Sequence, residues 1–156
     1  MLLGDGLSLR HRLVKGRWKD TGRPKDVLEA DQLVLSDLSP YARGKLEHDV
    51  KASGIVCIDE GTVIRSSTTL RDPLIIGKNC EIGPDVYVGP YTAIGDDTLI
   101  RGAEIEKTII VGDCRIDCRR RIVDSLLGRN AEITDSANSL LRGSRFIIGE
   151  NSVISV

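Results

Sequence analysis

Aromatic side chains are scarce in this sequence, which has one Phe, one Trp and three Tyr among 156 residues. Rings normally contribute much of the buried area in a domain of this size. Their scarcity means that the core must be built from branched aliphatic side chains instead, which suits a narrow and repetitive interior. The 16 glycines also favour a repetitive chain with many turns.

Other absences exclude whole classes of protein. No apolar run approaches the roughly 18 residues of a membrane-spanning helix, and Met1-Leu2-Leu3 leads directly into Gly4-Asp5-Gly6 rather than into a signal peptide. The net charge of -1 provides no overall field to attract nucleic acid or acidic lipid. The four cysteines form no CxxC pair. We therefore expect reduced thiols, a cytoplasmic protein, and neither nucleic acid nor membrane as a partner.

The clearest positive signal is an aliphatic residue at every sixth position. The series is Ile58, Ile64, Leu70, Ile76, Ile82, Val88, Ile94 and Ile100. The residue two positions before most of these is also small or apolar, and residues two apart share one face of a strand. Four of the aliphatics are followed by glycine, at positions 77, 83, 89 and 95. Each hexapeptide is thus predicted to be a short strand with two inward side chains, closed by a turn near a glycine with positive φ.

The period slips after Ile100 and then returns. Ile110, Ile116 and Ile122 resume it, and residues 127–133 and 148–154 restore the full pattern. Residues 134–146 break the period and are expected to form a loop or a corner insertion. A β-sandwich is the alternative, but alternating sandwich strands have no reason to keep a period of six.

This repeat resembles that of the hexapeptide proteins. The resemblance implies an all-β fold, a left-handed parallel β-helix with three hexapeptides in each triangular coil. Residues 55–156 would then form five to six coils, preceded by a short helical appendage.

Residues 1–54 follow a different pattern. Pro24 suits the first turn of a helix, apolar residues mark one helix face over residues 25–38, and Ser39-Pro40 ends it. The face comprises Val27, Leu28, Val34, Leu35 and Leu38. Residues 39–54 are polar and are expected to be a linker. Residues 1–25 hold seven Lys or Arg against two Asp, which fits either a surface for a sugar phosphate or nucleotide or a solvated basic stretch.

The segment Trp18-Lys19-Asp20-Thr21-Gly22 and the helix after it, together residues 16–30, carry a second resemblance. They are similar to the WxDTG turn and helix of sugar-1-phosphate nucleotidyltransferases, in particular glucose-1-phosphate thymidylyltransferases with a β-helix at the C-terminus. Residues 88–94, 121–130 and 146–152 resemble the tail of the same proteins, so the likeness covers residues 13–156. These enzymes join a nucleoside triphosphate to a sugar 1-phosphate and release pyrophosphate.

The resemblance implies that Asp20 is one ligand of a Mg²⁺ site. The second aspartate and the GxGTRL-type nucleotide loop of that family have no counterpart here. We therefore interpret residues 1–38 as the end of a nucleotidyltransferase domain, 39–54 as a linker and 55–156 as the β-helix. We expect no catalytic residues and no cofactor in the isolated chain, although the parent family uses Mg²⁺, and no substrate-binding residue is predicted.

Three functions remain to be compared. The chain is an assembly module for a nucleotidyltransferase, a subunit that completes the site of a split nucleotidyltransferase, or an acyltransferase. The acyltransferases on this repeat usually use a histidine base, but His11 and His48 both precede the repeat at Ile58. This disfavours the third function, and the isolated chain is expected to show no turnover.

Self-association is the expected role of the outer surface. With residues eighteen apart stacked, Cys57, Ile75 and Ala93 form an outward apolar strip, which suits a homo-oligomer, with a trimer favoured. The helix at 25–38 covering the strip is the alternative, and a separate nucleotidyltransferase domain is a further possible partner. Arg119-Arg120-Arg121 is either an anion site at a coil edge or a solvated edge, and Cys80 and Cys114 are assigned to core packing.

Overall fold

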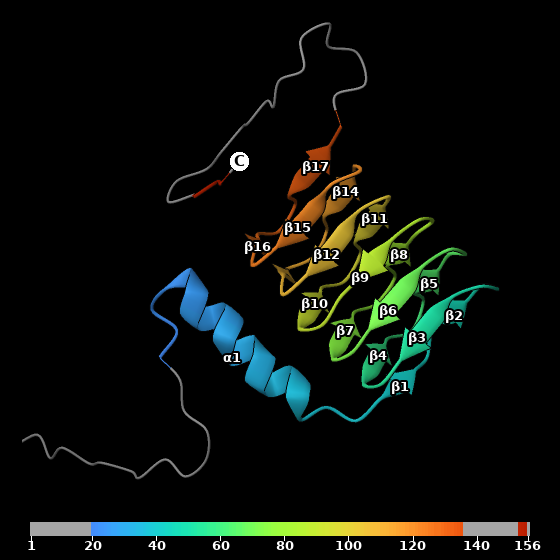
Figure 1. The fold of residues 1–156 in the computed structure, drawn as a ribbon, viewed down its shortest axis with the longest axis horizontal. Coiled ribbons are helices and arrows are strands. Elements are labelled where there is room, and N and C mark those ends of the chain that lie inside the picture. Colours follow the sequence, from blue (N-terminus) through green and yellow to red (C-terminus); the bar gives the residue numbers. More distant parts are fainter. Residues whose placement is uncertain (1–19, 136–152, 156) are drawn as a thin grey trace, which may run out of the picture.

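The chain folds as a left-handed parallel β-helix with one helix beside it in the described part (Figure 1). The structure is a computed structural model that describes residues 20–135 and 153–155. Sheet A contains β1 (Tyr41–Ala42), β4 (Val56–Ile58), β7 (Leu74–Ile76), β10 (Thr92–Ile94), β13 (Ile109–Ile110) and β16 (Leu126–Leu127). Sheet B contains β2 (Lys45–Leu46), β5 (Val63–Ile64), β8 (Glu81–Ile82), β11 (Leu99–Arg101), β14 (Arg115–Asp117) and β17 (Glu132–Thr134). Sheet C contains β3 (Lys51–Ser53), β6 (Thr69–Arg71), β9 (Tyr87–Val88), β12 (Glu104–Glu106) and β15 (Arg121–Val123).

Each coil contributes one strand to each of the three sheets. Coils 1 to 5 are β1–β3, β4–β6, β7–β9, β10–β12 and β13–β15, and β16 and β17 begin a sixth. Every strand pairs in parallel with the strand of the next coil, so the backbone groups of one coil are satisfied by its neighbours. The predicted fold class is therefore confirmed.

The eight aliphatic residues of the six-residue period lie inside the prism. All of them are at most 2% exposed, from Ile58 to Ile100. The second inward position holds Thr or Cys in many hexapeptides, and these polar side chains bond to backbone carbonyls. Thr62 donates to the carbonyl of Gly77 at 2.6 Å, and the Cys80 thiol donates to that of Gly95 at 3.3 Å. Most of these small hydroxyl and thiol groups are therefore satisfied within the aliphatic interior, and the exception among the described residues is the buried Thr68 hydroxyl, which has no hydrogen-bond partner.

The prediction of a linker at residues 39–54 was wrong. These residues contain β1, β2 and β3, which form the first coil and pair with β4, β5 and β6. The N–H groups of Arg43 and Lys45 donate to the carbonyls of Ile58 and Thr62, each at 2.8 Å. Leu46 and Ala52 continue the six-residue series into this coil and pair in register with the inward Ile64 and Leu70, so the repeat begins one coil earlier than predicted.

The position of positive φ also differs from the prediction. Of the glycines at 77, 83, 89 and 95, only Gly83 has a positive φ. The left-handed residue instead lies two positions after the glycine, as at Asn79, Tyr91 and Asp97. Glycine at 95 serves a different purpose, because a Cβ there would lie 2.9 Å from the backbone nitrogen of Gly112 in the next coil. Close stacking of coils, rather than turn geometry, requires it.

The slip of the period has a structural cause. Paired residues are eighteen apart from Lys45–Val63 to Glu81–Leu99, but Leu99 pairs with Arg115, sixteen residues later. Coils 4 and 5 are therefore shorter, while Ile110 and Ile116 still point inward and are at most 1% exposed. The expected loop at 134–146 and the repeat at 148–154 lie outside the described residues, except for 134, 135, 153 and 154.

Helix α1 (Pro24–Ser36) runs along the outside of sheet A (Figure 1). Leu35 is 1% exposed, whereas Val34, expected on the same buried face, is 62% exposed. Cys57 is on the outer side of sheet A yet fully buried, and its thiol donates to the carbonyl of Ser39 at 3.2 Å. Helix α1 and the segment after it therefore cover the Cys57 end of the predicted strip Cys57, Ile75 and Ala93. This agrees, for that end, with the alternative in which the helix covers the strip. No described helix is long and apolar enough to cross a membrane.

Candidate functional site

A recess with a volume of about 930 Å³ lies at the corner between sheets B and C. It follows from the lengths of three successive corners. The corner from Glu81 to Tyr87 takes six residues, that from Leu99 to Glu104 takes five, and that of coil 5 takes six again, as the paired registers show. The corner of coil 4 is therefore set back between two full corners, and Gly102 at this point adds no side chain.

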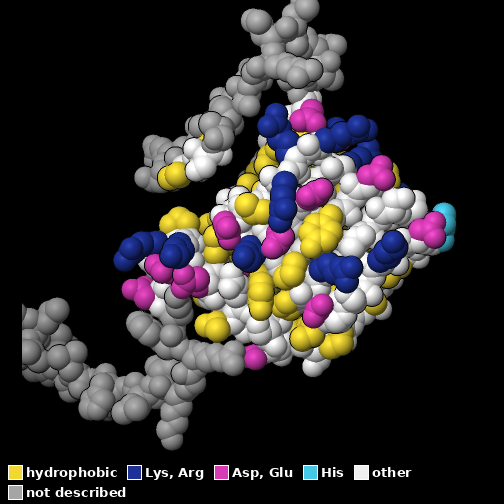
Figure 2. All heavy atoms as spheres, in the orientation of Figure 1, with side chains coloured by type: hydrophobic (Ala, Val, Ile, Leu, Met, Phe, Trp, Pro, Cys, Tyr) yellow, Lys and Arg dark blue, Asp and Glu magenta, His cyan; other side chains and the backbone are white. Residues whose placement is uncertain are grey.

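Five arginines line this recess, and most of them have acidic partners. Lys and Arg side chains gather at this end of the prism, next to β17 (Figure 2). Arg120 lies 3.5 Å from Asp135, and Arg115 lies 3.4 Å from Asp117. The other two, Arg101 and Arg121, pair with Glu81 and Glu106 at 3.1 and 3.0 Å. These four guanidinium groups are already neutralised at the rim.

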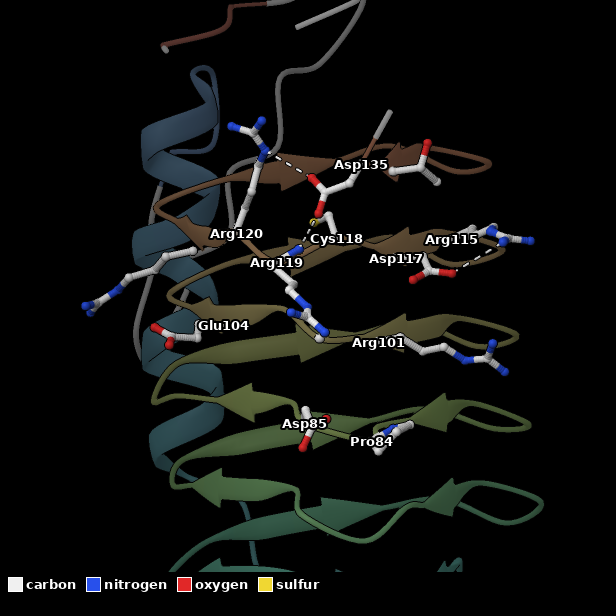
Figure 3. Close-up of a pocket in the computed structure, with 13 residues that line it drawn as sticks. Pro84, Asp85, Arg101, Glu104, Arg115, Asp117, Cys118, Arg119, Arg120 and Asp135 are labelled. Atoms are coloured by element: carbon white, nitrogen blue, oxygen red, sulfur yellow. Dashed lines mark hydrogen bonds and ion pairs between the residues drawn. The ribbon is translucent and has the colours of Figure 1, made fainter. Parts of the chain in front are cut away.

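Arg119 differs from the other four arginines. Its backbone N–H donates to Asp135 at 2.8 Å, but its guanidinium has no acidic partner among the residues that the structure describes. The side chain extends across the recess toward coil 4 (Figure 3). The Arg119 side chain passes close to Gly102, where a Cβ would lie 3.6 Å from its Cγ atom. Asp85 and Glu104, which also line the recess, have no ion pair in the described part of the chain.

The outer face of sheet B carries a ladder of alternating charges. Arg65 contacts Glu47 at 2.8 Å and Glu81 at 3.5 Å, and Glu81 also contacts Arg101. The hydrogen bond from Arg65 holds the pKa of Glu47 below its usual range, and Arg101 does the same for Glu81. Because Glu47, Arg65, Glu81 and Arg101 pair with one another across neighbouring coils, none of these four groups is a candidate for chemistry.

Asp20, the predicted half of a magnesium site, lies exposed just before α1. No group of three His, Cys, Asp or Glu residues that could hold a metal occurs in the described part of the chain. Mg²⁺ prefers near-octahedral oxygen ligation, so the described residues do not by themselves fit this ion. Of the basic residues before position 26, Arg23 and Lys25 are described, and they pair with Asp26 and Glu29 on α1 at 3.8 and 3.9 Å.

The prediction that His48 precedes the coils was wrong, because it lies within the first coil. It lies in the turn between β2 and β3 and is 83% exposed, with its Nε2 atom 3.7 Å from a carboxylate oxygen of Asp49. A base on an open surface has no pocket in which to hold an acyl acceptor. His11 lies outside the described residues.

The four cysteines are all buried and unpaired. Burial raises the pKa of the Cys80 and Cys118 thiols. A raised pKa lowers the fraction of reactive thiolate, which for Cys80 agrees with its predicted role in core packing. Cys118 lines the recess at 3% exposure, so it contributes wall rather than a nucleophile.

Known proteins with related sequences are nucleotidyltransferases. No protein-family profile matches the chain. It is 39% identical over 155 residues to the low-salt glycan biosynthesis nucleotidyltransferase Agl11 of Haloferax volcanii, and 36% identical over 155 residues to a glucose-1-phosphate thymidylyltransferase of Streptomyces antibioticus. Each alignment covers 99% of this chain and 43% of the relative. The matched region is the C-terminal part of these proteins. The chain corresponds to the C-terminal part of a glucose-1-phosphate thymidylyltransferase-like nucleotidyltransferase.

A more distant likeness is to the bifunctional protein GlmU of Methanocaldococcus jannaschii, 31% identical over 134 residues, or 85% of this chain and 32% of that protein. The chain thus spans less than half the length of these nucleotidyltransferase relatives. The resemblance predicted from the WxDTG turn and the repeat is confirmed at the level of the family.

The sequence analysis missed two features of this chain. Asp31 lies one helical turn before the buried Leu35, and burial raises its pKa to about 6. The recess around Gly102 was missed because its origin is a difference in length between neighbouring corners. Counting five rather than six residues from Leu99 to Glu104 would have revealed it.

Proposed function

We propose that the β-helix is an assembly scaffold, through which copies of a nucleotidyltransferase associate and hold their catalytic domains in place. The relatives that cover this chain are nucleotidyltransferases. The observation that carries the proposal is the combination of an aliphatic prism and exposed apolar residues at the C-terminal end of sheet A and at its edges with sheets B and C.

This apolar surface comprises Val111, Val123 and Leu126, which are 45%, 43% and 41% exposed. Leu126 extends the outward strip of sheet A, since it pairs in register with Ile109. Large apolar side chains grouped at a surface are typical of protein interfaces. The same strip nearer Cys57 is covered by α1 and the segment that follows it, so the C-terminal end is the part left for a second copy.

Sedimentation velocity of the full chain tests the scaffold. We expect the wild type to sediment as an oligomer and Leu126→Glu to shift it toward monomer, because a carboxylate would be buried at the contact. Val34→Glu is the control, since Val34 is 62% exposed on α1 and lies outside this surface. An oligomer that Leu126→Glu leaves intact, or a wild type that is monomeric, would contradict the proposed scaffold.

A subunit that completes a split nucleotidyltransferase is the second candidate. It is favoured by Asp20, which is exposed at the start of α1 and free to face another domain. The assay mixes the purified chain with dTTP, glucose 1-phosphate and Mg²⁺ and follows pyrophosphate. The scaffold alone should show no turnover. Turnover that Asp20→Asn abolishes would reject a purely structural role, and turnover that requires an added catalytic domain would favour the split enzyme.

A further inference from the structure

The recess between the corners of coils 3 and 5 has the features of a built binding site, and these do not depend on the proposed scaffold. Its position is set by backbone pairing on both sides: the N–H of Gly102 donates to the carbonyl of Pro84 at 3.2 Å, and that of Cys118 donates to the carbonyl of Arg101 at 3.3 Å. The short corner is therefore held in place by the coils above and below it. It forms a fixed floor rather than a mobile loop.

The charges around this floor select a class of ligand. Arg119 reaches over it with a guanidinium that has no ion pair within the described residues, while Arg120 stands next to it, already paired with Asp135 (Figure 3). A guanidinium presents N–H donors in a planar arrangement that matches two oxygens of a phosphate group. Asp85 and Glu104 present carboxylates on the same recess, and a carboxylate accepts hydrogen bonds from hydroxyl groups.

We propose that this recess binds a small organic phosphate that carries hydroxyl groups, with its phosphate on Arg119 and its hydroxyls donating to Asp85 and Glu104. The size and charge balance argue for a small ligand. Five arginines in the lining are offset by four acidic residues, so the surface has no large positive field. A nucleic acid would require a more positive surface along its backbone. A hollow of about 930 Å³ falls within the range of small-molecule sites.

The test measures binding to the full chain by calorimetry, with glucose 1-phosphate, inorganic phosphate and glucose as probes. Glucose 1-phosphate should bind saturably, inorganic phosphate more weakly, and glucose not measurably. Arg119→Gln should weaken glucose 1-phosphate by about ten-fold or more, as expected for loss of a charge-assisted hydrogen bond to an anion. Arg119→Lys, which keeps the charge, should retain part of the affinity. Affinity for the wild type should fall as salt is raised.

Arg71→Gln is the matched control. Arg71 is exposed on coil 2 with a single long hydrogen bond, 3.4 Å to Ser53, and it lies away from the recess. Far-ultraviolet circular dichroism confirms that each variant is folded. Absence of saturable binding, equal affinities for the Arg119 and Arg71 variants, or glucose binding as tightly as glucose 1-phosphate would each overturn the proposal. The scaffold would stand in all three cases, because its test is sedimentation of the Leu126 variant.

Discussion

Replacing Val88 by aspartate tests the interior of the prism most directly. Val88 is fully buried on sheet C and pairs in register with Leu70 below and Ile105 above, both also fully buried. Every neighbour of the new carboxyl group along the stack is therefore aliphatic. No backbone group at this inward position is free to donate to it, because sheet pairing already uses those groups.

The expected loss of stability has two parts. Removing a buried valine costs about 2 kcal/mol of lost apolar burial. Placing an unpaired carboxyl group in the same space costs a further ~1–3 kcal/mol if it is neutral. At neutral pH the group must also take up a proton, which adds about 1.4 kcal/mol for each unit by which its pKa is raised. The total approaches the roughly 5–15 kcal/mol stability of a whole domain.

Urea denaturation followed by circular dichroism measures this loss. Because burial raises the pKa of the aspartate in the folded state, the loss should be largest at pH 7 and should shrink as the pH falls toward the pKa of an unfolded aspartate, about 4. Val34→Asp is the control, since Val34 is 62% exposed on α1 and lies outside the proposed interface, and its effect should stay within about 0.5 kcal/mol. Equal urea midpoints for the two variants would refute the assignment of inward positions.

Three further predictions concern the helix and the stacking of coils. Asp31→Asn should raise the melting temperature at pH 7 by removing a half-buried charge. The wild type should approach the variant as the pH falls below about 6, since protonation stabilises a group whose folded pKa is raised; a gap that widens on acidification would contradict this sign. Gly95→Ala should destabilise by about 1–3 kcal/mol because its Cβ would meet the backbone of the next coil, whereas Gly128→Ala, which has open space, should be neutral in the same urea titration. Leu35→Ala should accelerate modification of the Cys57 thiol by a maleimide, because the helix that covers this face is loosened, and an unchanged rate would show that α1 does not protect it.

Much of the fold could be read from local patterns. Inward and outward side chains alternate along each strand, and this alternation recurs every six residues. The series from Ile58 to Ile100 was therefore sufficient to predict the interior and the β-helix. The helix was predicted from Pro24 and its apolar positions to within two residues of its observed end. The relation to nucleotidyltransferases rested on short sequence matches, such as the turn at Asp20, that do not depend on the fold.

Contacts between coils could not be predicted in this way. The first coil at residues 41–53 was missed although Leu46 and Ala52 continue the six-residue series and pair in register with Ile64 and Leu70. Its many polar residues hid this pattern, and backbone hydrogen bonds to coil 2 define the coil. Burial of Cys57 depends on the placement of α1 against sheet A, and the exposure of Val34 shows that helical periodicity alone did not settle which side faces inward. The recess at Arg119 arises from a one-residue difference between corners that are sixteen to eighteen residues apart in sequence, and pairing in three dimensions is what places those corners side by side.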